Sequence, residues 1–280
     1  MLPALTGLPG WAEDDHEAAL DAYRRSSDVV RRPGPASART FFEGAFRPGS
    51  PVDGHLTGYY EPELEAARAP SDAFPVPIHA LPPGGTDACR ADADVALSGH
   101  EIAWLRDPVD RFMLQVQGSG RLRLNDGTTM RVGFAETNGH PYRSIGRMLV
   151  ASGALAPGLT ADRLAAWLRA DPERGRAAMD ANPSYVMFRV LNLAPDQGPP
   201  GKLCPVTAGR SIAVDPSHIP LGTPVWVEGP GWARLCVAQD TGSAIKGLGR
   251  VDLFCGTGTE AGLEAGRLDH PCRMTPLVPR

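Results

Sequence analysis

The chain has 280 residues, with 28 basic and 32 acidic side chains, a net charge of −4 and no long block of like charge. This balance gives no electrostatic footprint for nucleic acid, and the length predicts two domains of roughly 100 to 150 residues or one long β-rich domain. No apolar run reaches the roughly 18 residues of a membrane span, and the N-terminus lacks the basic-then-apolar pattern of a secretory signal.

The five cysteines are odd in number and widely spaced, at Cys89, Cys204, Cys236, Cys255 and Cys272. They lack the close pairs of a structural zinc site, and the histidines show no metal-ligand spacing, so no metal is expected. Two interpretations of the cysteines remain open: one or two disulfides in an oxidising compartment, or small buried thiols.

The first half of the chain predicts one helix followed by strands. Apolar residues at helical spacing indicate an amphipathic helix over 13–32. From Gly54 onward, short β-branched and aromatic segments cut by Pro and Gly predict strands within 55–62, 73–83, 111–124 and 128–138. Asn125-Asp126-Gly127 lies between two alternating runs and predicts a hairpin.

Helices return after residues 140–155 and again at 160–170, where Thr160 is the expected N-cap. A Pro/Gly cluster at 194–201 then indicates a linker or domain boundary. Further strands are predicted within 205–216, 223–228, 233–240 and 250–256, and residues 256–268 read as a turn that enters a short helix.

Two aspartates near the C-terminus are candidates for catalysis. Asp240 ends one predicted strand and Asp252 lies inside the next, so we expect a hairpin with both carboxylates on neighbouring strands. Alternation predicts that Asp240 shares a face with Cys236 and Ala238, whereas Asp252 points away from the apolar residues beside it. Burial and a second carboxylate nearby raise the pKa of such a side chain, as a general acid requires. The alternative is an ordinary strand-edge or turn aspartate.

The segment 240–243, Asp-Thr-Gly-Ser, also matches the core of aspartic peptidases, in which two aspartates share a proton. Gln239 precedes it where a large apolar residue is usual, and the sequence has no second Asp-Thr-Gly or Asp-Ser-Gly. A peptidase would therefore have to form its dyad as a homodimer.

Other short motifs fit their usual chemistry poorly. The glycines within 256–262 leave too little chain for a dinucleotide-binding unit, so no cofactor is expected. Gly118-Ser119-Gly120 is not a nucleophile elbow, because Gln117 precedes it. Gln117 and Ser119 instead offer an amide and a hydroxyl for sugar hydroxyls, or form a plain turn. Likewise, the tyrosines of 57–60 are either sugar-stacking surfaces or core.

Several separated motifs, in one order, resemble the membrane-bound lytic transglycosylase A family. The likeness covers nearly the whole chain from Thr57 onward. Its terminal block resembles the module named for three aspartates, here Asp215, Asp240 and Asp252. The motifs are Thr57-Gly58-Tyr59-Tyr60-Glu61-Pro62, Gln115-Val116-Gln117-Gly118-Ser119-Gly120, Asn138-Gly139-His140-Pro141-Tyr142, Asn182-Pro183-Ser184-Tyr185-Val186, residues 213–222, and residues 238–247.

The resemblance implies a mainly β protein with some helix, in which a double-psi β-barrel domain (residues 1–83 and 201–280) carries an inserted β-rich substrate-binding domain (residues 84–200). A glycan groove is expected between the two. Asp252 maps to the catalytic aspartate and Asp240 to an assisting one. Substrate-binding residues are expected at Thr57, Tyr60, Gln117, Gly118 and Ser119.

The implied reaction is cleavage of the bond between N-acetylmuramic acid and N-acetylglucosamine in peptidoglycan, with Asp252 acting first as acid and then as base. The implied partners are glycan strands. A periplasmic location, or outer-membrane association through a segment absent from this sequence, is implied by the family alone. A glycan-binding barrel without catalytic activity is the competing class, and a dimeric aspartic peptidase is a more distant one.

Overall fold

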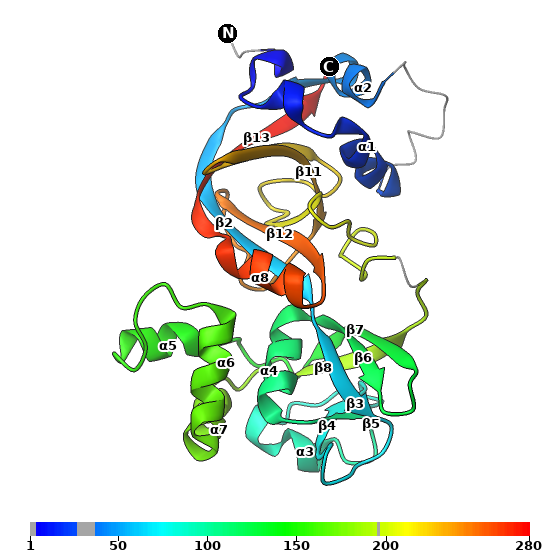
Figure 1. Cartoon of the computed structure of the whole chain (residues 1–280), viewed down its shortest axis with the longest axis vertical. Coiled ribbons are helices and arrows are strands. Elements are labelled where there is room, and N and C mark those ends of the chain that lie inside the picture. Colours follow the sequence, from blue (N-terminus) through cyan, green and yellow to red (C-terminus); the bar gives the residue numbers. More distant parts are fainter. Residues whose placement is uncertain (1–3, 27–36, 195–196) are drawn as a thin grey trace. The chain divides into compact units, whose positions relative to one another are not determined.

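The computed structural model describes residues 4–26, 37–194 and 197–280. The chain divides into two compact units, Met1–Tyr60 with Asp196–Arg280, and Glu61–Pro195 (Figure 1). The chain leaves the first unit after Tyr60, earlier than the boundary predicted at residue 84. Residues 61–83, which were predicted to belong to the first domain, carry two strands that pair within the second unit.

The first unit is built on a seven-stranded sheet with the order β1-β13-β10-β11-β9-β12-β2. Because β2 also pairs with β13, the strands from β13 to β2 close into a ring and β1 lies outside it. This closure, with the parallel β9–β11 pair, is consistent with the expected double-psi barrel. The strands are β1 (Phe46–Pro48), β2 (Val52–Glu61), β9 (Ser211–Val214), β10 (Pro224–Gly229), β11 (Trp232–Asp240), β12 (Arg250–Thr257) and β13 (Asp269–Pro279).

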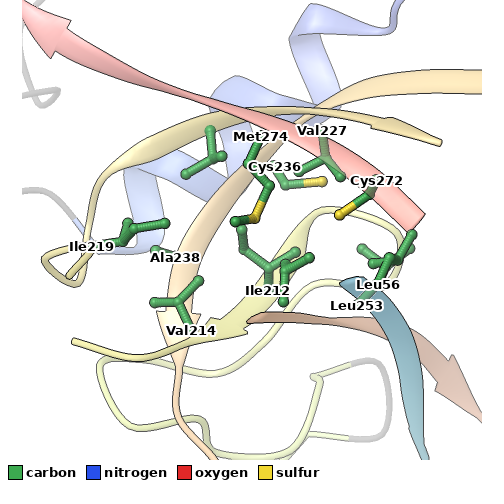
Figure 2. Close-up of a cluster of buried hydrophobic side chains, with 12 residues drawn as sticks. Leu56, Ile212, Val214, Ile219, Val227, Cys236, Ala238, Leu253, Cys272 and Met274 are labelled. Carbon is green, nitrogen blue, oxygen red and sulfur yellow. The ribbon is translucent and has the colours of Figure 1, made fainter. Parts of the chain in front are cut away.

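The barrel interior is filled by aliphatic and sulfur-containing side chains from all six strands of the ring (Figure 2). Ile212 and Val214 of β9 alternate inward, as do Val251 and Leu253 of β12. Residues between them, including Asp252, consequently point away from the core. All five cysteines are unpaired, and three of them are buried.

Short helices cover one side of this barrel. Trp11 packs against Trp226 of β10 with ring centroids 5.1 Å apart, in a cluster that includes Leu20 and Phe42. The predicted N-terminal helix begins at His16 rather than residue 13, because the Asp15 side chain caps it; its predicted end lies outside the described residues. Among the described residues of this unit, the helices are 3-10 turns at Leu5–Gly7 and Trp11–Glu13, α1 (His16–Arg25), α2 (Ala38–Ala45) and α8 (Thr259–Arg267).

The second unit contains a six-stranded sheet with the order β4-β5-β3-β6-β7-β8. Its strands are β3 (Glu63–Ala67), β4 (Val76–His79), β5 (Glu101–Leu105), β6 (Ser119–Leu124), β7 (Thr129–Thr137) and β8 (Val186–Leu191). Its helices are a 3-10 turn at Arg90–Asp92, α3 (Ala93–Ala96), α4 (Pro108–Gln117), α5 (Ile145–Ala151), α6 (Ala161–Ala170) and α7 (Pro172–Asp180). Two local predictions are confirmed: the hairpin between β6 and β7, and Thr160 as the N-cap of α6.

The strand predicted over 111–124 is wrong in its first half, which forms α4. Asp107 caps this helix by accepting from Val109 N and Asp110 N, and Pro108 occupies its first turn. Gly118 ends it in the left-handed conformation, with φ at 80°. These helix start and stop signals, rather than the strand-like pattern between them, determine the structure of this segment.

Candidate active site

Asp252 lies inside β12 and faces away from the barrel core. It is in register with Ala213 of β9, and its side chain is only partly accessible to solvent. Burial removes hydration from the carboxylate and raises the pKa of Asp252 to about 6. The geometry therefore provides a carboxyl group that retains its proton in mildly acidic solution.

Two neighbouring side chains act on this carboxyl group. The Thr57 hydroxyl of β2 donates to Asp252 Oδ1 over 2.5 Å, and Arg250 Nη2 donates to Thr57 Oγ1 over 2.9 Å. Both neighbours lower the pKa of Asp252, which partly offsets the effect of burial, whereas Asp240 raises it. In the described part of the chain no protein group donates to Oδ2. Oδ2 is consequently the oxygen that can present a proton to a ligand.

Asp240 reaches the same face of the sheet through a β-bulge. The register of β11 against β9 shifts between Ala238 and Asp240, so that Asp240 also pairs with Ala213. Two predictions are therefore wrong: β9 separates the strands of the two aspartates, and Asp240 does not follow Ala238 into the core. A bulge re-aims the side chain that follows it, which strict alternation does not anticipate.

Both oxygens of Asp240 are engaged by the protein. Oδ1 accepts from the main-chain nitrogens of Lys202 and Thr241 over 2.9 and 2.8 Å, and Oδ2 accepts from the Tyr59 hydroxyl over 2.8 Å. Burial raises the pKa of Asp240, while these three donors lower it. Asp240 thus holds Tyr59 and the main chain at Lys202 in place.

Two family models match separate regions of this chain. A family model described as the MltA specific insert domain matches residues 86–189, and a second, the 3D domain, matches residues 210–278. Membrane-bound lytic murein transglycosylase A of Vibrio cholerae is 31% identical over 91% of this chain and 74% of its own length. The chain belongs to the MltA family. It covers 64% of the length of the Escherichia coli relative of the same name, which is 33% identical over 78% of this chain.

Solved MltA structures agree with the fold described above. A membrane-bound lytic murein transglycosylase from Agrobacterium tumefaciens is 29% identical and superposes with a TM-score of 0.86, covering 100% of this chain and 97% of that one. E. coli MltA with bound chitohexaose is 27% identical and has a TM-score of 0.77, covering 94% and 84%. The mainly β fold with some helix is thereby confirmed.

Three residues predicted to bind substrate lie in the inserted unit of this MltA-family chain. Gln117 is the last residue of α4, Gly118 is its C-cap, and Ser119 begins β6. A backbone with a positive φ at Gly118 thus joins helix to strand, between the amide of Gln117 and the hydroxyl of Ser119. Their role in glycan binding remains a prediction.

Tyr59 rather than Tyr60 belongs to the aspartate site. Tyr59 packs on Phe254 with ring centroids 5.2 Å apart, and burial together with Asp240 raises its pKa well above the usual value. Tyr60 lies against α8, where a Cβ on Gly262 would meet its ring at 3.0 Å. The period of two along β2 places Thr57 and Tyr59 on one face, and this signal was available in the sequence.

The third aspartate of the 3D module has a structural role in this MltA-family chain. Asp215 follows β9 and accepts from Gly247 N over 2.8 Å, from Ser217 N and from the Ser217 hydroxyl. These donors hold the pKa of Asp215 below its usual range. Asp215 therefore ties the turn after β9 to the loop that precedes β12.

Proposed function

We propose that this protein is a peptidoglycan lytic transglycosylase that uses Asp252 as its single acid and base. The supporting observation is the environment of Asp252, whose pKa is raised to about 6 while its Oδ2 lacks a protein donor in the described residues. The relatives named lytic murein transglycosylase A and the MltA structure with bound chitohexaose support a glycan substrate.

The reaction needs one proton donor and no water. Neutral Asp252 protonates the glycosidic oxygen between N-acetylmuramic acid and N-acetylglucosamine, and the bond from that oxygen to C1 breaks through an oxocarbenium-like transition state. The C6 hydroxyl oxygen of the N-acetylmuramic acid residue then bonds to C1 of the same sugar, while the hydroxyl proton passes to the Asp252 carboxylate. The product is a 1,6-anhydromuramoyl end, and Asp252 is again protonated.

The hydrogen bonds that Asp240 accepts from the protein fit a mechanism in which Asp252 is the only carboxyl group that reacts. Glycosidases that hydrolyse need a second carboxylate to attack carbon or to activate water. Both oxygens of Asp240 accept hydrogen bonds from the protein, which supports a positioning role for Asp240 rather than direct attack on the substrate. Asp240 instead influences Asp252 through its charge.

Product analysis on purified peptidoglycan tests the proposal. A lytic transglycosylase releases anhydromuropeptides, each lighter by one water than the hydrolysis product. Release of reducing-end muropeptides alone would show a hydrolase instead. No release, with the glycan retained on the protein, would favour the non-catalytic glycan-binding barrel.

Glycan binding is proposed to involve Thr57, Tyr60, Gln117, Gly118 and Ser119. An amide and hydroxyls are suited to sugar hydroxyls, and an aromatic ring is suited to a sugar face. Replacing Ser119 or Gln117 by Ala is expected to raise KM with a smaller effect on kcat. A fall in kcat with KM unchanged would assign these side chains to the chemical step.

A cell-envelope location is proposed from the family, whose curated members are named membrane-bound. No helix among the described residues is both long and apolar enough to cross a bilayer. Fractionation of cells that express the complete native gene tests the location. Recovery in the periplasmic or outer-membrane fraction is expected, and recovery with cytosolic markers would contradict it.

A further inference from the structure

Arg250, two residues before Asp252 on β12, donates only to neutral oxygens. Its Nη1 donates to the main-chain oxygens of His55 and Val251 over 3.2 and 2.9 Å, and its Nη2 donates to the Thr57 hydroxyl. Within residues 4–26, 37–194 and 197–280, no carboxylate forms an ion pair with Arg250. Its positive charge is thus not neutralised by a direct partner.

The proton of the Thr57 hydroxyl has one available direction. An arginine N–H can only donate, so Thr57 Oγ1 accepts from Arg250 and must direct its own proton toward Asp252 Oδ1, 2.5 Å away. The two hydrogen bonds therefore have the same direction: Arg250 donates to Thr57, and Thr57 donates to Asp252. A hydrogen bond to a carboxylate is stronger than one to a neutral carboxyl group. The hydrogen bond from Thr57 therefore strengthens when Asp252 loses its proton.

We propose that Arg250 is a positioning residue that acts through the Thr57 hydroxyl to stabilise the Asp252 carboxylate formed in the first step of catalysis. This rests on the proposed function, since it requires Asp252 as the acid. When Oδ2 gives its proton to the glycosidic oxygen, the negative charge spreads to Oδ1, where Thr57 donates. When the C6 hydroxyl returns a proton, the same bond weakens again and the enzyme is reset.

The other charged groups around Asp252 act differently. Asp240, across β9, opposes Arg250 by favouring the protonated form of Asp252. Burial raises the pKa of Cys255 to about 12, so this thiol keeps its proton at working pH. The charged groups that act on the pKa of Asp252 are Arg250 on β12 and Asp240 on β11. Tyr59 on β2 donates to Asp240, and His55 on β2, whose main-chain oxygen accepts from Arg250, forms an exposed pair with Asp269 on β13.

The test compares pH profiles of anhydromuropeptide release for variants at Arg250. Arg250→Gln is expected to lower kcat about tenfold and to move the descending limb of kcat/KM upward by about half to one pH unit, because the charged form of Asp252 loses stabilisation. Arg250→Lys keeps the charge, so it should keep the limb in place and recover part of kcat. The control is Arg273→Gln, which removes an exposed arginine of β13 and should leave the profile unchanged.

A double-mutant cycle decides whether Arg250 works through Thr57. If it does, adding Arg250→Gln to Thr57→Val lowers kcat little further, whereas independent effects would multiply. Thr57→Ser keeps the hydroxyl and should preserve the response to Arg250→Gln. An Arg250→Gln enzyme with an unshifted limb and unchanged kcat, or multiplicative losses in the cycle, would overturn the proposal.

Controls separate this proposal from the proposed function. Thermal melting identifies any variant that fails to fold. If Arg250→Gln does not fold, Arg250→Lys is compared with the wild type instead. If the wild-type protein releases no anhydro products, or if Asp252→Asn retains full activity, the proposed function fails first. If both controls behave as expected and only the Arg250 results disagree, the role of Arg250 alone is rejected.

Discussion

Asp240 and Asp252 occupy one row of the barrel, on the two strands that flank β9, and both are in register with the same residue of that strand. Two strand spacings place their backbones about 10 Å apart, which allows one charge to act on the other. Asp240 accepts its hydrogen bonds from groups such as the Tyr59 hydroxyl and the Lys202 main-chain nitrogen, and not from Asp252. The pair therefore differs from a peptidase dyad, in which two aspartates share one proton.

Asp252→Asn should abolish most turnover. Asparagine keeps the shape of the side chain but neither donates nor accepts the proton, so kcat should fall by roughly 100- to 10,000-fold or more. Binding of glycan strands should survive, which a sedimentation assay with insoluble peptidoglycan measures. Asp162→Asn, at an exposed position of α6, is a control that should keep full activity. Substantial turnover by Asp252→Asn would reject Asp252 as the acid.

Asp252→Asn should also stabilise the fold near neutral pH. The pKa of Asp252 is raised from 3.8 to about 6, so the folded state binds more protons than the unfolded state between these values. Stability of the wild type therefore falls as pH rises through this window, and the variant escapes a cost of about 1 to 3 kcal/mol at pH 7. Urea unfolding at pH 4 and pH 7 measures this cost: the difference in unfolding free energy between the variant and the wild type should be small at pH 4 and larger at pH 7.

Asp240→Asn should move the pH optimum downward while leaving partial activity. For the wild type, kcat/KM should decline above a pH of about 6, where Asp252 loses its proton. Removing the Asp240 charge lowers the pKa of Asp252, so this decline should begin at lower pH. A pH–rate profile of both proteins measures the shift. An inactive Asp240→Asn beside a substantially active Asp252→Asn would reverse the assignment.

Gly58→Ala should damage both stability and activity. A Cβ at this position of β2 would meet the Ala265 Cα at 2.7 Å and Cys255 Sγ at 3.1 Å, so β2 or α8 must shift. Because Gly58 lies between Thr57 and Tyr59, a displaced β2 moves both partners of the aspartates. We expect a loss of about 1 to 3 kcal/mol in unfolding free energy and a lower kcat.

Gly44→Ala in α2 provides a matched control for that substitution. A Cβ there meets no atom within 4 Å, and alanine favours a helix by up to about 1 kcal/mol. This variant should melt at the wild-type temperature or above and keep full activity. Equal melting temperatures for the two variants would contradict the close packing between β2 and α8.

Local chemistry determined much of the secondary structure. Thr160 caps α6 and Asn125-Asp126-Gly127 turns between β6 and β7, because caps and tight turns depend on residues a few positions apart. Asp107 and Pro108 carry the same kind of signal, but the strand prediction rested on the segment after them alone and was therefore wrong. Asp252 was identifiable as a candidate acid because a carboxylate between two apolar strand residues must either face out or stay neutral.

The tertiary structure decided how the site is assembled. The placement of β9 between β11 and β12 and the bulge before Asp240 arise from strand pairing across long stretches of chain, which a local pattern does not encode. Three of the donors to the aspartates likewise come from far along the chain, from Thr57, Tyr59 and Lys202. The sequence alone determined which carboxyl groups were available, whereas the pKa of each depends on its burial and neighbours, and these exist only once the barrel closes.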